Sequence, residues 1–560
     1  MSDIKKLDVQ HVEPVGEHGK PAILAASSLA ARFEHRQHSL SKVEAIKENK
    51  LPLAWCLYMF FICVAWGFDG LAGGVVVSIA EFRKDYGKPY GGDYVVDANW
   101  QLGFQAGTLF AMVFGGWMAG LFIDRVGRQP VIGAAFIISI GGVFLQVFSK
   151  NIGQFLGGKV LTGIDADILK PLGVFTTAAP PYASEMAPLA IRGSISAGMN
   201  FAIVLGQLIG YGVMRQASFY GDSRAYKVLF ATQWGFAAVG IAILPFFPEY
   251  VATFFIVSLY FIQVLTKEYP RSPYWLIANG KSEKARKNLE KLHDADYDFD
   301  GHMAEINDSL TLQRQQNDSQ GGMLDCFKKD AWKRTLVATS MFFIQNCCGS
   351  AWVIGYMSYY FQLAGMETSK SFDTTVGLCG MMVVGNICGW WFIDWFGRRS
   401  TALYGCIALC VTLFLIGILS VINASGAVWG QVVFMAVWSF VYQATVGAVA
   451  WPIATEAATS RLRGPTQALA TMVNGLSSSI WSMSLPYAIN PDQGNLGGKI
   501  AFIFGSTLAV SAVFIFFMIP ETKGRTYIEI DELWARGIPP RKFKETELIT
   551  VPVEELKSVD

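Results

Sequence analysis

Charge is scarce in this sequence and nearly balanced. Only 16% of the 560 residues are charged, the formal net charge is +1, and 52% are hydrophobic. A soluble chain of this length needs far more charged surface, so a soluble multidomain protein is excluded. A near-neutral chain also lacks the basic field that attracts nucleic acid, so we expect no nucleic-acid partner. The mean hydropathy of +0.35 indicates a membrane protein instead.

Histidine is missing from every apolar stretch. The six histidines lie in the N-terminal tail or in a central polar stretch: His11, His18, His35, His38, His293 and His302. Proton chemistry inside a membrane therefore has to use carboxylates. Of nine cysteines only Cys326 is clearly outside an apolar block, and their spacing suggests neither a zinc site nor a disulfide framework. We expect no metal and no cofactor. Residues 1–50 are polar and show no signal-peptide pattern.

The apolar residues gather into blocks of about 20, long enough to cross a hydrocarbon core of about 30 Å as a helix. The blocks lie at roughly 54–80, 100–122, 130–148, 154–183, 194–215, 228–265, 335–361, 374–393, 400–422, 429–453, 466–487 and 500–518. They predict an all-α membrane protein with twelve transmembrane helices in two six-helix bundles. The expected divisions are an N-terminal tail (1–52), a first bundle (53–269), a helical linker (270–333), a second bundle (334–519) and a C-terminal tail (520–560).

Lysine and arginine are unequally shared between the two sides of such a bundle. If twelve helices alternate, both tails, the central linker and most basic loops fall on the same side. The loop with Arg83, Lys84 and Lys88 falls on the other side, where Asp85, Asp93 and Asp97 offset its charge. The positive-inside rule then places both termini in the cytoplasm, and we expect the plasma membrane.

Two motifs recur at matched places in the two halves. The pattern D-x-x-G-R follows the second and eighth blocks, and a Glu followed seven residues later by Arg-Gly follows the fourth and tenth. Paired acids and bases at helix ends suit a gate that closes in one state and breaks in the other, although static charges at the membrane surface are the alternative. The candidate gating residues are Asp124, Arg125, Arg128, Glu185, Arg192, Asp394, Arg398, Glu456 and Arg463.

These residues also carry a resemblance. The stretches that carry it are Gly120–Arg128, Pro180–Gly193, Gly206–Leu208, Trp451–Gly464 and Pro520–Thr526. With these stretches the chain resembles the sugar porter branch of the major facilitator superfamily over about residues 50–535. Cys348–Tyr356 and Gly537–Lys544 look most like fungal maltose (α-glucoside) permeases, which are proton symporters. The resemblance implies a non-enzymatic carrier whose partners are a sugar, protons and the lipid bilayer, and we expect a monomer.

One carboxylate lies inside the first apolar block. Burying Asp69 in a membrane costs about 2.5–3.5 kcal/mol on insertion scales, so it needs a partner or a watery path. By the resemblance, Asp69 corresponds to the proton-carrying acid of sugar symporters and Lys159 to its basic partner. Pairing with an ammonium favours the ionised carboxylate, whereas loss of the pair favours protonation. A fixed structural ion pair is the alternative.

Sugar binding requires polar groups and a flat aromatic surface in a concave site. By the resemblance, the sugar-contacting positions are Gln207, Gln345, Asn346, Trp451 and Asn474, with Trp66 as an additional aromatic wall. A single amide in a membrane helix more often joins two helices, but five matched positions in five helices favour a shared site. Ala351 and Gly355 are smaller than the residues that hexose carriers have here, and a wider site suits a disaccharide.

Two segments depart from the family pattern. The run 165–170 interrupts the fourth block with two acids and a lysine, and 250–271 splits a motif between Glu249 and Ser272. Both are predicted to come from misread exon boundaries, unless they are true elaborations, which sequencing of the transcript decides.

The favoured function is proton-coupled uptake of an α-glucoside by alternating access. A hexose transporter or facilitator and a non-transporting sugar sensor are the alternatives. No nucleophile–base set or phosphate loop supports an enzyme.

Overall fold

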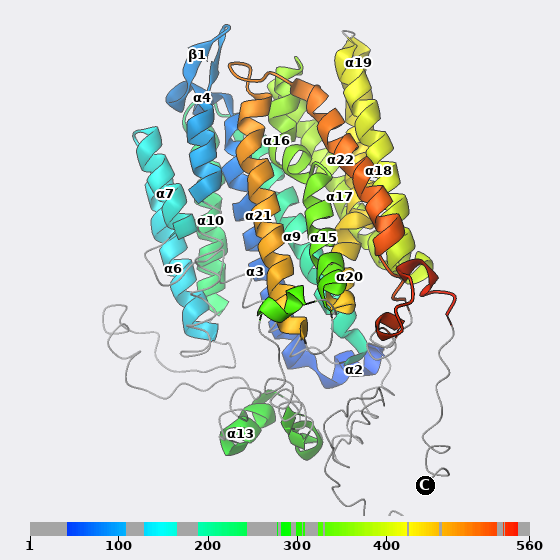
Figure 1. Ribbon diagram of the computed structural model, residues 1–560. Helices are drawn as coiled ribbons and strands as arrows, with labels where there is room; N and C mark the ends of the chain where they lie inside the picture. The colour runs from blue at the N-terminus through cyan, green and yellow to red at the C-terminus, as the bar shows by residue number, and fades with distance from the viewer. Residues whose placement is uncertain are drawn as a thin grey trace, which may run out of the picture.

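The structure, a computed structural model, describes these residues: 42–107, 128–164, 189–243, 277, 282–292, 298–304, 306–307, 323–328, 331–422, 425–458, 462–523, 530 and 533–546. They form an upright bundle of long helices (Figure 1). A short β-hairpin lies at one end of the bundle, which we call the hairpin end. Helices α2 (Lys42–Glu48) and α13 (Ser282–Leu292) lie at the opposite end, which we call the α2 end.

The first half of the bundle is built from helices that overlap the first six predicted blocks. They are α3 (Lys50–Val75), the helical residues 98–107, α6 (Arg128–Val147), α7 (Ile152–Ile164), α9 (Leu189–Ala217) and α10 (Arg224–Ile243). The predicted segments 165–170 and 250–271 lie outside the described residues.

The second half is described almost continuously. Its elements are η3 (Met323–Phe327), α15 (Trp332–Cys347), α16 (Ser350–Leu363), α17 (Thr368–Phe396), α18 (Arg398–Val421), α19 (Ser425–Ala444), α20 (Val446–Ala457), α21 (Arg463–Ile489), η5 (Gly497–Lys499), α22 (Ile500–Met518) and η6 (Pro540–Lys542). Across both halves, seven stretches of the described residues are long and apolar enough to span a membrane.

Glycine allows α3 and α9 to pack with their backbones almost in contact. A Cβ added to Gly67 would lie 2.1 Å from the Ile203 carbonyl oxygen, and one added to Gly206 would lie 2.1 Å from that of Val64. Any larger residue would push the two helices apart. Small residues serve the same purpose wherever membrane helices approach closely.

Two of the predicted spans in the second half are broken helices. α15 and α16 meet at Gly349, whose φ of +85° is a left-handed conformation that glycine adopts without strain. α19 and α20 are separated at Thr445. The first break is stabilised by side chains: Trp438 Nε1 donates to the Cys348 carbonyl at 3.2 Å, and Thr507 Oγ1 donates to that of Cys347 at 3.0 Å. Broken helices of this kind line the substrate path in transporters.

The hairpin end carries structure that the sequence reading left undivided. After α3 the chain forms η1 (Val76–Ser78) and α4 (Ala80–Tyr86), then the antiparallel strands β1 (Lys88–Tyr90) and β2 (Asp93–Val95). Gly91 and Gly92 join the strands with φ values of +61° and +91°. Two positive φ values in a two-residue turn match the twist of a tight hairpin.

Candidate functional site

The predicted proton-coupling residues lie in two helices of the first half. Asp69 is half-buried in α3, and Lys159 is buried in α7 with 7% of its surface exposed. Their charges attract each other, but the described contacts include no direct ion pair between them. The structure therefore places the two groups near each other without locking them together.

Two of the predicted sugar-contacting amides bind each other. Asn346 in α15 donates from Nδ2 to Asn474 Oδ1 in α21 at 2.8 Å and to Ser477 Oγ at 3.0 Å. It also donates to its own helix, at the Phe342 carbonyl, at 2.9 Å. Asn346 is 9% exposed, so in this conformation its amide joins two helices. Asn474 is half-buried beside it.

The remaining predicted sugar contacts come from separate helices. Trp451 in α20 is 45% exposed and meets the Phe342 ring edge-on, with centroids 4.7 Å apart. Gln345 in α15 faces the Tyr442 hydroxyl. Gln207 in α9 is half-buried, and its Oε1 has no hydrogen-bond partner among the described residues. Trp66 is half-buried in α3. No hydrogen bond of the described residues joins Gln207 to Gln345, so the first-half amide stands apart from the second-half set.

A second amide group, which sequence reasoning missed, links the two halves near their middle. Gln443 at the end of α19 accepts from Asn200 Nδ2 of α9 and from Asn386 Nδ2 of α17, each at 3.4 Å. Gln443 and Asn386 are both buried, and Asn386 Oδ1 has no partner among the described residues. Polar residues inside three apolar blocks were the available signal.

At the α2 end, part of the predicted gate is assembled within the second half. Arg398 at the start of α18 pairs with Glu456 of α20 at 3.3 Å, and both side chains are about four-fifths buried. The other Glu456 oxygen accepts the Thr522 hydroxyl. This contact brings the segment after α22 into the same cluster.

Glu521 is a gate residue that was not predicted, although it lies in the motif Pro520–Thr526. Its carboxylate accepts the backbone N–H groups of Arg398 at 2.8 Å and Arg399 at 3.2 Å, and so caps the start of α18. Gly397, the glycine of D-x-x-G-R, has φ +85°, and a Cβ there would lie 2.6 Å from Glu521. The motif therefore needs glycine both for its backbone conformation and for space.

The other predicted gate residues are described only in part or not at all. Asp124, Arg125 and Glu185 lie outside the described residues. Arg128 begins α6, Arg192 lies in α9, Asp394 lies in α17 and Arg463 begins α21, but the structure does not describe their side chains.

A buried arginine fastens α15 to the end of α20. Arg334 is 5% exposed and donates to the carbonyls of Ala457 at 2.9 Å and Ala458 at 3.0 Å. Carbonyls at a helix end lack partners in their own helix, so this cation satisfies groups that burial would otherwise leave unpaired.

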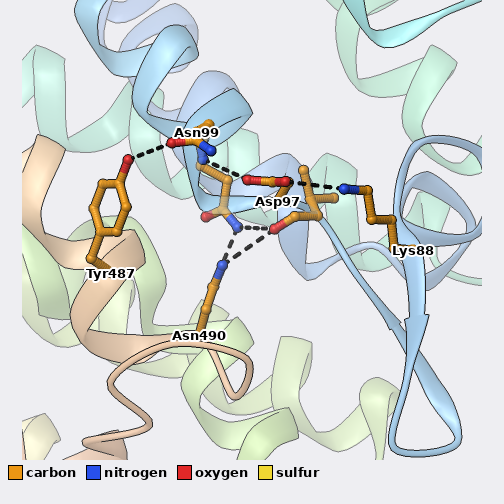
Figure 2. A network of polar contacts seen from close by, with 7 residues as sticks. Lys88, Asp97, Asn99, Tyr487 and Asn490 are labelled. Carbon is orange, nitrogen blue, oxygen red and sulfur yellow. Dashed lines mark hydrogen bonds and ion pairs between the residues drawn. The ribbon is translucent and has the colours of Figure 1, made fainter.

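At the hairpin end, by contrast, polar contacts cross from one half to the other (Figure 2). Tyr487 of α21 donates its hydroxyl to Asn99 Oδ1 at 2.8 Å. Asn490 donates to the Val96 carbonyl at 3.2 Å and accepts from Gln101 Nε2 at 3.3 Å. Arg215 at the end of α9 also pairs with Asp373 near the start of α17. The two halves are therefore joined at this end.

A family model described as "Sugar (and other) transporter" matches residues 55–258 and 250–534. The two matched stretches meet inside the predicted extra segment. Among curated relatives, the general alpha-glucoside permease of Saccharomyces cerevisiae is 27% identical over 93% of this chain and 81% of its own length. The maltose permease MAL31 of S. cerevisiae is 27% identical with the same coverage. The alpha-glucosides permease MPH3 of S. cerevisiae is 26% identical over 97% of this chain and 88% of its own length.

Solved structures confirm the fold. The inward-open xylose transporter XylE from E. coli superposes with a TM-score of 0.63 at 20% identity, covering 86% of this chain and 100% of that one. The proton:xylose symporter XylE bound to 6-bromo-6-deoxy-D-glucose, a major facilitator superfamily protein, gives 0.63 at 20% identity, covering 87% and 100%. The predicted helical membrane architecture is therefore confirmed.

Proposed function

Because the chain belongs to the sugar transporter family of the major facilitator superfamily, and is thus an integral membrane permease and not an enzyme, we propose that it takes up an α-glucoside such as maltose. Uptake is coupled to protons and proceeds by alternating access of a site between the two halves. The observation that carries the substrate class is the similarity to α-glucoside and maltose permeases over 93% of the chain.

Space between the halves supports a disaccharide. A Cβ placed on Gly355 in α16 would meet no atom within 4 Å. The backbone oxygen of Gly355 lies 3.6 Å from the corresponding position on Gly74 of α3, so this open space borders both halves. A second sugar ring needs room of this kind, whereas a larger residue at Gly355 would reduce it.

Coupling is assigned to Asp69 and Lys159. A half-buried carboxylate that feels a buried ammonium, without a direct bond to it, changes its proton affinity when the distance between them changes. Alternating access provides that change, because helices of one half shift relative to the other. A proton loaded in one state is then released in the other.

Sugar binding is assigned to Trp66, Gln207, Gln345, Asn346, Trp451 and Asn474. The unpaired oxygen of Gln207 and the exposed ring of Trp451 are groups that a sugar hydroxyl and a sugar C–H face would satisfy. Asn346 and Asn474 already share a hydrogen bond, so they act as one unit that positions α15 against α21.

The inner gate is assigned to the acidic and basic clusters at the α2 end. Arg398 and Glu456, with Glu521, form the second-half part, and the motifs at 124–128 and 185–192 supply the first-half part. With both termini in the cytoplasm, the α2 end faces the cytoplasm and the hairpin end faces outward. We place the protein in the plasma membrane, with two bundles (53–269 and 334–519) joined by a cytoplasmic linker (270–333).

Uptake of radiolabelled sugars into cells without endogenous sugar carriers tests this function. Maltose and other α-glucosides should accumulate above the external concentration, and a proton uncoupler should abolish accumulation. Preferential uptake of a hexose would replace the substrate class, and accumulation insensitive to the uncoupler would remove the coupling. Sugar binding without any flux would favour a sensor.

A further inference from the structure

The hairpin is held firmly to the first half. Lys88 pairs with Asp97 at 3.3 Å, and Arg83 pairs with Asp93 at 3.4 Å. Arg83 is buried, and its guanidinium also donates to the Val77 carbonyl at 2.9 Å. These charged contacts bind β1, β2 and the following turn to α4, so the hairpin moves as one piece with its own half.

Asn490 is the centre of the contact with the second half. It is fully buried, and it follows directly after α21, where its backbone N–H donates to the Pro486 carbonyl at 3.1 Å. Its side chain then bonds Val96 and Gln101, and Gln101 Nε2 itself donates to the Val96 carbonyl at 2.9 Å (Figure 2). The three polar groups close a small ring that excludes water.

Two tyrosine hydroxyls extend this contact. Tyr487 lies three residues before Asn490, on the same face of α21, and reaches Asn99. Tyr90 at the tip of β1 donates its hydroxyl to the Pro491 carbonyl at 3.2 Å. We name the outer latch as Tyr90, Val96, Asn99 and Gln101 of the first half with Tyr487, Asn490 and Pro491 of the second.

The kind of bond differs on the two sides of the hairpin. Charged pairs hold it to the first half, whereas the outer latch crosses to the second half through neutral hydrogen bonds. Neutral hydrogen bonds exchange with water at small net loss, while groups bonded to a charge are held more strongly. The weaker set is therefore the one that opens.

We infer that the outer latch is the external gate of the transport cycle, and that it sets the ratio of externally closed to externally open molecules. This inference rests on the proposed function for its direction, since the hairpin end must face outward. It assigns a gating role to residues in the connections outside the sugar site.

External labelling of a buried position tests the gate without sugar. A cysteine in place of Gly355 fits without a clash and lies between the halves, deeper in the bundle than the end of α16. The nine native cysteines are all buried or half-buried, and the unsubstituted chain gives their background. A membrane-impermeant maleimide should label the Gly355→Cys chain slowly from outside.

Removing one neutral hydrogen bond of the outer latch should raise that labelling rate about fivefold in the Tyr487→Phe variant. Asn490→Ala removes two such bonds and should raise it at least about tenfold. Tyr90→Phe should raise it about twofold, because this tyrosine is 49% exposed and its bond competes with water. The matched control is Tyr94→Phe on the same hairpin, 38% exposed, whose hydroxyl makes no described contact with the second half; its rate should not change.

Equal labelling rates in Tyr487→Phe, Tyr90→Phe and Tyr94→Phe would overturn the inference and show that the hairpin is a static cover. If Asn490→Ala does not reach the membrane, the phenylalanine variants still decide. Sugar uptake by the parent chain is measured in parallel. Graded labelling without uptake would refute the proposed function and leave the gate standing, whereas uptake with equal labelling would do the opposite.

Discussion

At the hairpin end, polar contacts pass from one six-helix half to the other, whereas at the α2 end the described contacts of the second half stay within it. Tyr487 and Asn490 reach across to Asn99 and Val96, while Arg398 and Glu456 bond each other. Two halves that are bonded at one end only are closed at that end. The α2 cluster is thus assembled in advance and awaits first-half partners in the opposite state.

The largest predicted effect concerns the integrity of the α2 end. Arg334→Ala leaves the buried carbonyls of Ala457 and Ala458 without their cation, and each bond to a charged group contributes about 1.5–3 kcal/mol. We expect a loss of about 3 kcal/mol in the free energy of unfolding, measured by thermal unfolding of the purified protein. Lys333→Ala, an exposed neighbour, is the control. Equal stability of the two variants would show that α20 does not depend on Arg334.

A change at the α2 end should act in the opposite direction to a change in the outer latch. Glu456→Gln weakens the pair with Arg398, and with it the gate that closes the α2 end when the hairpin end is open. External labelling of Gly355→Cys should therefore fall about fivefold, if the pair is worth about 1 kcal/mol. A rise in labelling would show that Glu456 does not favour the externally open state.

The exposed ion pair between the halves should matter less. Asp373→Asn removes the partner of Arg215, whose side chain is 23% exposed against 56% for Asp373. Exposed pairs contribute about 0.2–1 kcal/mol and are screened by salt, so labelling should rise about twofold at low salt and less at high salt. Asp222→Asn is the control, because its pair with Arg224 stays within the first half. A larger effect at high salt would contradict the electrostatic account.

The smallest effect is a predicted lack of pH dependence. The Asn99 backbone N–H, and then Lys88, hold the pKa of Asp97 below its ordinary value of 3.8. A lowered pKa means that the carboxylate stabilises the fold above 3.8 and loses this contribution only as the pH falls through the lower folded value.

Labelling of Gly355→Cys should therefore stay constant from about pH 7 to pH 5. Rates are normalised to Gly221→Cys, an exposed position between α9 and α10, because thiol reactivity itself changes with pH. A rise on acidification that disappears in Asp97→Asn would show that external protons open the latch.

Much of the fold could be predicted because long apolar blocks leave few alternatives. A block such as 400–422 has to cross the membrane as a helix, since lipid offers no partner to an open backbone. The breaks were not predicted. Composition does not reveal that Gly349 takes a positive φ, because glycine is equally common in unbroken membrane helices. The hairpin was missed because its strands have three residues each, although Gly91-Gly92 is a turn signal.

The candidate site shows a different limit. Sequence places an amide at Asn346 and another at Asn474, but it does not say that the two bind each other. Gln443 and Glu521 were missed for the same reason, since their roles depend on which distant helix faces them. Pairing across helices is a property of packing, and a single sequence carries little of that information.

Coupling at the middle of the bundle is the central claim, and Asp69→Asn tests it most directly in vesicles with an imposed proton gradient. The amide cannot release a proton, so maltose should no longer accumulate against its gradient, while exchange of labelled for unlabelled maltose should continue. Full accumulation by the Asp69→Asn chain would contradict the account, because the proton would then have to travel with a different group.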